Sequence, residues 1–187
     1  MNDPRELIAT MERTGAPAVL ATLLRRAADG PGPVRRRLLD SAPAPLGEPV
    51  LEVLASGRSR ILALEPGPLL DLLGGAGDGV QVLLERLLPG KLPPWLHCSA
   101  QTLRRGGACV LATVIAQAGD VPAAAGDRFV YDERNHGLLP MDGRFSPELQ
   151  RACERARAAG RPIWERFSLP GGSLQVGLEP WPAPPSA

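Results

Sequence analysis

The sequence predicts an α+β fold built from two tandem copies of a small α/β sandwich-like domain, related by an internal pseudo-two-fold. The 187 residues suit two small domains, and 44% of them are hydrophobic, which is enough for a core. The same order of expected elements occurs twice, and three short segments recur in that order. The recurring segments are Val19–Thr22 with Val110–Thr113, Ala55–Arg58 with Ala158–Arg161, and Gln81–Glu85 with Gln175–Glu179.

The first half begins with an expected helix over residues 4–14. Asn2 or Asp3 is its expected cap, Pro4 lies in the first turn, and Gly15 ends it. Hydrophobic runs and turn residues predict the rest of this half. The expected elements are a strand over 17–26, a breaker at 30–33, a strand over 34–40, a helix over 46–57 that ends at Gly57, a strand over 58–67, a helical turn near 68–75 and a strand over 79–90.

The second half repeats this order. Its clearest helix runs from Ser146, the expected N-cap, through Pro147 to Gly160 as the C-cap. About a dozen extra residues, 131–142, predict an added hairpin with its turn near Asn135 and Gly137. The other expected elements are a helix over 99–107, a strand over 108–117, a breaker over 119–126, and strands over 127–132, 162–169 and 172–181.

A proline-rich linker over residues 87–99 is expected to separate the two copies. We expect one repeat over 1–90, a second over 91–182, and a disordered tail over 183–187. Because each copy alone buries a limited core, we expect the two to pack face to face, like an intrachain dimer.

Composition and charge exclude several classes of protein. The net charge of +1 provides no field for nucleic acid or an acidic membrane. The N-terminal residues lack a continuous apolar run, so we expect neither signal peptide nor membrane anchor, and a cytoplasmic protein. Cys98, Cys109 and Cys153 have no C-x-x-C spacing, which argues against a disulfide framework or a structural zinc site. His97 beside Cys98 is only a weak metal signal.

Five segments of the second half carry a resemblance to a known family. They are Leu111–Ile115, the loop Gly119–Pro122 with Gly126, Met141–Arg144, Gly160–Pro162 and Leu178–Pro180. In this order they resemble the amino-terminal domain of the XdhC/CoxI family, accessory proteins that help to assemble xanthine dehydrogenase and related molybdenum hydroxylases. The resemblance covers residues 97–182 well and residues 5–89 only as an eroded copy.

Two departures from the family matter. The family has a cysteine in its glycine-rich turn, whereas this sequence places Arg144 there and Ser41 at the matching place in the first copy. Neither side chain can replace a thiolate in molybdenum or sulfur chemistry. Full-length members also carry a Rossmann-type domain, and no strand followed by G-x-G-x-x-G occurs in this sequence.

The resemblance and the residue chemistry together predict a binding site rather than a catalytic one. The small-residue loop could present backbone N–H groups to a phosphate or a pterin edge, and two arginines could grip an anionic group. A tight connection between two strands explains the loop without any ligand. The expected site residues are Gly119, Asp120, Pro122, Gly126, Arg128, Asp142, Gly143 and Arg144.

Arg35, Arg36 and Arg37 lie on the matching strand of the first copy. Strand alternation sends Arg35 and Arg37 to one face and Arg36 to the other. Either an anion site or a solvated edge strand protected by charge accounts for them.

Three functions are open at this point. The first is a non-enzymatic XdhC-like accessory protein, a chaperone that binds a molybdenum hydroxylase subunit, its molybdopterin cofactor, or a separate XdhC-type Rossmann protein. The second is a scaffold subunit that binds no ligand. The third and weakest is an enzyme that acts on a small anionic substrate, because no triad, P-loop or metal cluster is evident. The sequence leaves a homodimer open.

Overall fold

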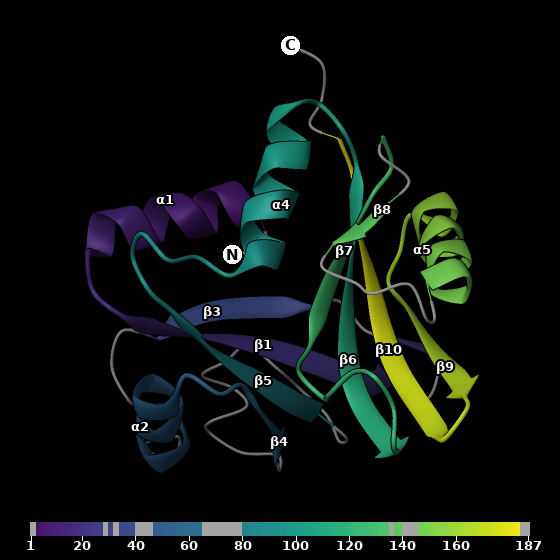
Figure 1. The fold of residues 1–187 in the computed structure, drawn as a ribbon. Coiled ribbons are helices and arrows are strands. Elements are labelled where there is room, and N and C mark those ends of the chain that lie inside the picture. The colour runs from purple at the N-terminus through teal and green to yellow at the C-terminus, as the bar shows by residue number, and fades with distance from the viewer. Residues whose placement is uncertain are drawn as a thin grey trace. The chain divides into compact units, whose positions relative to one another are not determined.

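The computed structural model describes residues 3–27, 30–31, 34–39, 47–64, 80–134, 137–139 and 146–183. The chain divides into two compact units, Met1–Pro93 and Pro94–Ala187. Each unit combines helices with one antiparallel sheet (Figure 1). The predicted α+β fold with two similar tandem units is therefore confirmed.

The sheet of the first unit has the strand order β3-β1-β5-β4, and the short β2 also pairs with β1. All of these pairings are antiparallel. The elements of this unit are α1 (Pro4–Thr14), β1 (Ala18–Ala27), β2 (Gly30–Pro31), β3 (Arg35–Leu39), α2 (Gly47–Ser56), β4 (Arg60–Leu64) and β5 (Val80–Leu87).

The sheet of the second unit has the order β8-β7-β6-β10-β9 and is also antiparallel. Four of its strands, β7-β6-β10-β9, repeat the order β3-β1-β5-β4 of the first unit. The elements of this unit are α4 (Pro94–Arg104), β6 (Cys109–Gly119), β7 (Arg128–Asp132), β8 (Gly137–Leu139), α5 (Ser146–Ala159), β9 (Ile163–Leu169) and β10 (Gly172–Trp181).

Helix ends follow the signals in the sequence. The Asp3 carboxylate accepts a 2.8 Å hydrogen bond from the backbone N–H of Arg5, which makes Asp3 the N-cap of α1. Gly15, Gly57 and Gly160 end their helices with φ values of 64°, 72° and 61°. The three predicted C-caps are confirmed.

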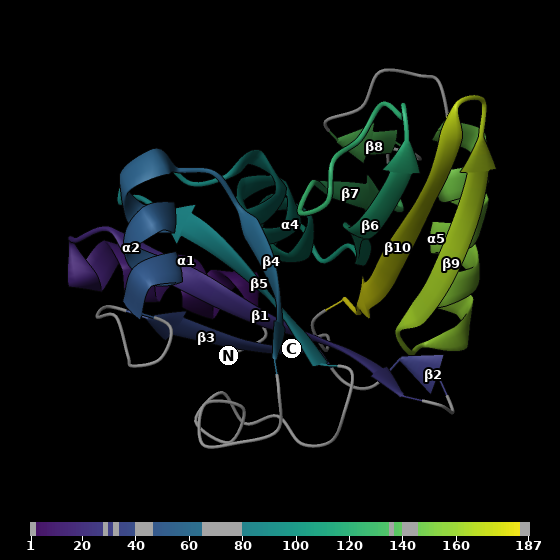
Figure 2. The same ribbon diagram turned by 90° about the horizontal axis from the view of Figure 1, so that it is seen from below.

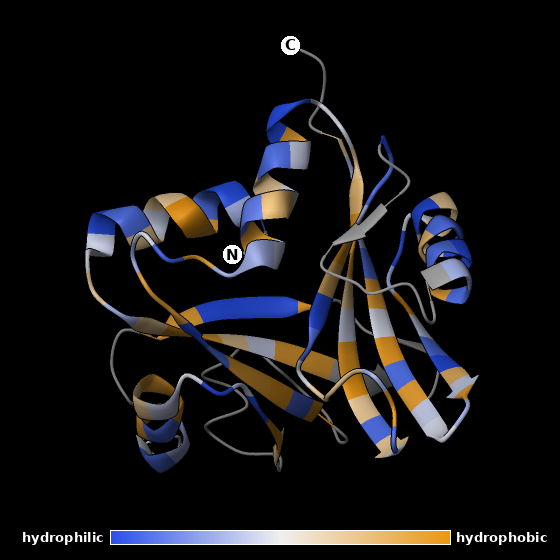
Figure 3. Ribbon diagram, in the orientation of Figure 1, coloured by the Kyte–Doolittle hydropathy of each residue, from blue (hydrophilic) through white to orange (hydrophobic). Residues whose placement is uncertain are grey.

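One helix in each unit covers one face of the sheet. In the first unit α2 contacts β1 and β5, and in the second unit α5 runs along β9 and β10 (Figure 2). Alternate residues on the strands face each core, and Figure 3 shows apolar and polar residues alternating along β10. The first core includes Val19, Ala21, Leu23, Val50, Val53, Val82 and Leu84. The second includes Val110, Ala112, Val114, Tyr131, Leu149, Cys153, Val176 and Leu178.

Two expectations about local structure need correction, and a third is confirmed. The helix expected over 99–107 begins at Pro94, inside the expected linker, because proline at the first helical position loses no hydrogen bond. The expected breaker at 30–33 contains β2, whose Gly30 pairs with Ala27. The added hairpin is confirmed as the pair β7 and β8, in which Asp132 pairs with Gly137.

Some expectations fall on parts of the chain that the structure does not describe. The helical turn near 68–75, Ser41, Asn135 and the last four residues of the tail are among them. In the described part of the chain, no helix is long and apolar enough to cross a membrane.

Candidate functional site

The loop between β6 and β7 uses its own backbone N–H groups internally. Ala124 N–H donates to the Asp127 carboxylate and Ala125 N–H to the Gln117 amide oxygen, both at 2.8 Å. Gly126 N–H donates at 2.8 Å to the carbonyl of Val114. A phosphate or pterin edge at these three groups would have to displace existing acceptors, so the loop is built as a strand connection.

Gly119 allows another group to approach its backbone closely, but that group is the backbone of Gly171 and Gly172. A Cβ on Gly119 would lie 2.1 Å from the carbonyl oxygen of Gly171, and one on Gly172 would lie 1.9 Å from that of Ala118. Asp120 N–H donates to the Gly171 oxygen at 3.0 Å. We call this contact between the end of β6 and the β9–β10 turn the glycine clasp.

The structure places the loop and Arg128 on opposite sides of the sheet. Ala123 is buried in the core beneath α5, and Val121 packs against that core. Arg128 precedes Phe129, which belongs to the same core, so its side chain points to the other face. The loop and Arg128 therefore do not form the shared ligand site that the sequence predicted.

Arg128 lies beneath α4. Its side chain is only 6% exposed, and its guanidinium carbon lies 4.4 Å from the centre of a Trp95 ring. This distance is that of a cation–π contact. Trp95 belongs to the first turn of α4, which contacts β6 and β7. Helix α4 thus closes the second face of the sheet over the arginine.

The first unit contains the same arrangement at matching positions. Arg36 pairs with Thr22 in β1, as Arg128 pairs with Thr113 in β6. On the other side, Leu20 pairs with Glu85, as Leu111 pairs with Glu179. We call these six residues the duplicated Arg–Thr–Glu set: Arg36, Thr22 and Glu85 in the first unit, and Arg128, Thr113 and Glu179 in the second.

Five of the six residues are buried, unlike ordinary surface charges, and Glu179 is half-buried. Arg36 is 7% exposed and Glu85 6% exposed, and both threonines are buried. Arg35 and Arg37 on either side of Arg36 are exposed, which confirms the predicted alternation. The recurrence of Gln81–Glu85 as Gln175–Glu179 indicates that the two glutamates occupy matching positions. Only the strand register shows that they share a face of the sheet with the arginines.

One position beside the set differs between the units. Leu83 pairs with Thr22 in the first unit, whereas Gly177 pairs with Thr113 in the second. A Cβ on Gly177 would lie 3.0 Å from Ile115 Cδ1 and 3.6 Å from Trp164 Nε1. Neighbouring side chains therefore fill the space that the missing leucine leaves.

The cysteines are placed for packing. Cys109 and Cys153 are buried, and burial raises the pKa of each thiol to about 12. Burial also raises the pKa of Cys98. Thiols with raised pKa values remain protonated at neutral pH and are poor nucleophiles and ligands. Among the described residues, no three His, Cys, Asp or Glu side chains group around a possible metal.

Alkaline pH should destabilise the protein through these thiols. The unfolded chain releases thiol protons near pH 9, whereas the folded chain holds them to about pH 12. The free energy of unfolding should therefore fall as pH rises through this window. Urea unfolding at a series of pH values should show a shallower fall for Cys153→Ala than for the wild type. Equal slopes would contradict a buried, protonated thiol.

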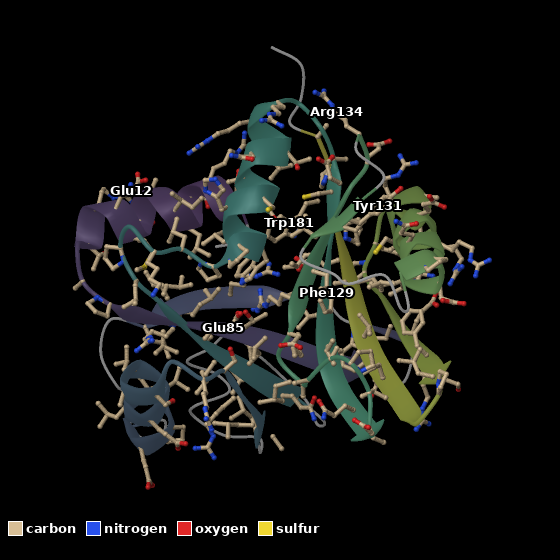
Figure 4. The ribbon with its side chains drawn as sticks, viewed as in Figure 1. Glu12, Glu85, Phe129, Tyr131, Arg134 and Trp181 are labelled. Atoms are coloured by element: carbon tan, nitrogen blue, oxygen red, sulfur yellow. The ribbon has the colours of Figure 1, made fainter. Side chains whose placement is uncertain are left out.

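Tyr131 makes a further polar contact beneath α5. Its hydroxyl donates a 3.1 Å hydrogen bond to the Glu154 carboxylate, and Figure 4 places its side chain beside that helix. Burial, followed by the Glu154 contact, raises the pKa of Tyr131 to about 12. The contact ties β7 to α5.

The expected site residues Asp142, Gly143 and Arg144 lie outside the described residues. A scan against protein-family models and a search of curated proteins found no match for this chain.

Proposed function

We propose that this chain is a non-enzymatic, XdhC-like accessory protein that binds a molybdenum hydroxylase subunit or its molybdopterin cofactor. One observation carries the proposal. The second unit runs α4, β6, loop, β7, β8, α5, β9 and β10, with Gly160–Pro162 after the helix and Glu179–Pro180 in the last strand. Apart from the added β8 and the pair of final strands, this order is similar to that of the family domain that the sequence resembles, and the first unit has a similar order.

Protein binding is favoured over cofactor binding. Three loop amides already donate within the second unit, and Arg128 is buried against Trp95. These contacts leave little polar surface for a pterin at the loop. They also favour the second candidate, a scaffold subunit that binds protein and no cofactor.

A tagged chain expressed together with a molybdenum hydroxylase subunit tests the proposal. The purified chain should retain the subunit, and oxidation followed by fluorescence should reveal any bound pterin. The control is the same expression in a host that makes no molybdopterin. Retention of the subunit in both hosts without pterin would favour the scaffold role. Recovery of neither subunit nor pterin would overturn the accessory role.

A further inference from the structure

Three exposed arginines gather where α4 ends. Arg104 is the last residue of the helix, Arg105 follows it, and Arg134 comes from the turn after β7. The place that a Cβ on Gly107 would take lies 3.3 Å from Arg134 Nε, and for Gly106 the nearest atom is Arg134 Nη2 at 3.7 Å. The side chain of Arg134 therefore lies across the glycine turn (Figure 4). We call these three residues the arginine patch.

The backbone holds the two segments of the patch together. Gly106 has a φ of 70°, and its N–H donates to the carbonyl of Leu103 at 3.0 Å. Gly107 N–H donates to the carbonyl of Thr102 at 3.0 Å, and Glu133 N–H donates to that of Ala108 at 3.4 Å. Since the two glycines have no side chains, the guanidinium of Arg134 can lie beside the end of α4.

Three other arginines of the second unit have carboxylate partners, whereas no ion pair is found for the patch arginines among the described residues. The ion pairs elsewhere in this unit are Arg151 with Glu148, Arg155 with Glu165, and Arg157 with Glu133. Asp132 lies next to the patch, but it is only 7% exposed and its carboxylate accepts the backbone N–H of Arg134. The patch thus brings together three exposed arginines for which the described residues supply no ion pair.

A helix C-terminus favours nearby cations, which accounts in part for Arg104 and Arg105. It does not account for Arg134, which comes from a different segment and is positioned by the glycine turn. Planar guanidinium groups match carboxylates in bidentate geometry. With a net charge of +1, the chain lacks the broad positive field that nucleic acid requires.

We propose that the arginine patch docks an acidic segment of a partner polypeptide. The proposal rests on the proposed function in one respect, since the partner is then the molybdenum hydroxylase subunit. Charge pairs at the rim of an interface mainly set the association rate and the dependence on salt. Binding through the patch should therefore weaken as the Debye length shrinks to about 8 Å at physiological ionic strength.

The test uses the full chain and a fluorescein-labelled peptide of alternating Glu and Ser, measured by fluorescence anisotropy. The triple variant Arg104→Ala, Arg105→Ala, Arg134→Ala should bind the peptide at least about tenfold more weakly than the wild type. The matched control, Arg151→Ala, Arg161→Ala, Arg166→Ala, removes the same charge from exposed arginines elsewhere on the unit. It should change affinity less than about twofold.

Three outcomes would overturn the docking proposal: equal losses of peptide affinity in the two variants, no peptide binding by the wild type, or displacement of the peptide by inorganic phosphate at matched ionic strength. The outcome for the proposed function is separate. If the wild type retains the hydroxylase subunit but the patch variant binds the peptide normally, the docking proposal is wrong and the accessory role stands. If the patch variant loses the peptide but the wild type retains no hydroxylase subunit, the accessory role is wrong and the docking proposal stands.

Discussion

Replacing Gly119 by alanine is expected to lower the free energy of unfolding of the second unit by about 3 kcal/mol. Two effects add. Gly119 has a φ of 79°, which is unfavourable for any residue with a Cβ, and that Cβ would lie 2.1 Å from the carbonyl oxygen of Gly171. The contact is with backbone, so the glycine clasp would have to open for the alanine to fit.

Urea unfolding followed by tryptophan fluorescence measures this effect in the correct unit, because Trp95, Trp164 and Trp181 all belong to the second unit. The matched control is Gly160→Ala. Gly160 also has a positive φ, of 61°, but no atom lies within 4 Å of its Cβ position. Gly160→Ala should lower the free energy of unfolding by only about 1 kcal/mol. Equal losses for the two variants would show that the clasp contributes nothing beyond backbone conformation.

Replacing Arg128 by alanine is the second change with a large expected effect, a loss of about 3 kcal/mol from the second unit. Truncation removes the stacking on Trp95 and leaves a void beneath α4, where the side chain is 6% exposed. Arg128→Lys keeps the charge but loses the planar group, and it should retain part of the stability.

Urea unfolding again provides the measurement, and the Trp95 environment provides a second readout. Tryptophan emission of folded Arg128→Ala should shift relative to the wild type, because the cation over the Trp95 ring is gone. Arg166→Ala is the control, since Arg166 is exposed on β9 and, among the described residues, has a single 3.4 Å hydrogen bond, to Ser173. A loss for Arg128→Ala no greater than the control's would contradict a packing role for the buried arginine.

Sequence patterns predicted most of the fold because local signals and repetition agreed. Asp3, Gly15, Gly57 and Gly160 each act at the position where the backbone requires them. The start of α4 was predicted wrongly because Pro94 can mean a linker or a first helical turn. Only the contact of that helix with the sheet decides between the two.

The candidate site could be predicted only in part. Composition identified the Gly119–Gly126 loop, but the acceptors of its amides, Gln117 and Val114 in β6 and Asp127 before β7, follow from how the loop folds back on the strands. The partner of Arg128 could not be predicted, because Trp95 lies more than thirty residues away on a separate helix. Distant contacts of this kind follow from topology, which residue chemistry alone does not specify.

The difference between Leu83 and Gly177 has a consequence for how the two units have specialised. In the first unit a central strand supplies the volume beside the buried threonine, whereas in the second unit the edge-strand residue Trp164 and Ile115 supply it. Because protein interiors are close-packed, glycine at position 177 is tolerated only when Trp164 and Ile115 fill the space beside it. The repeats have therefore become non-interchangeable parts: β10 transplanted in place of β5 would bring a glycine without the side chains that compensate for it.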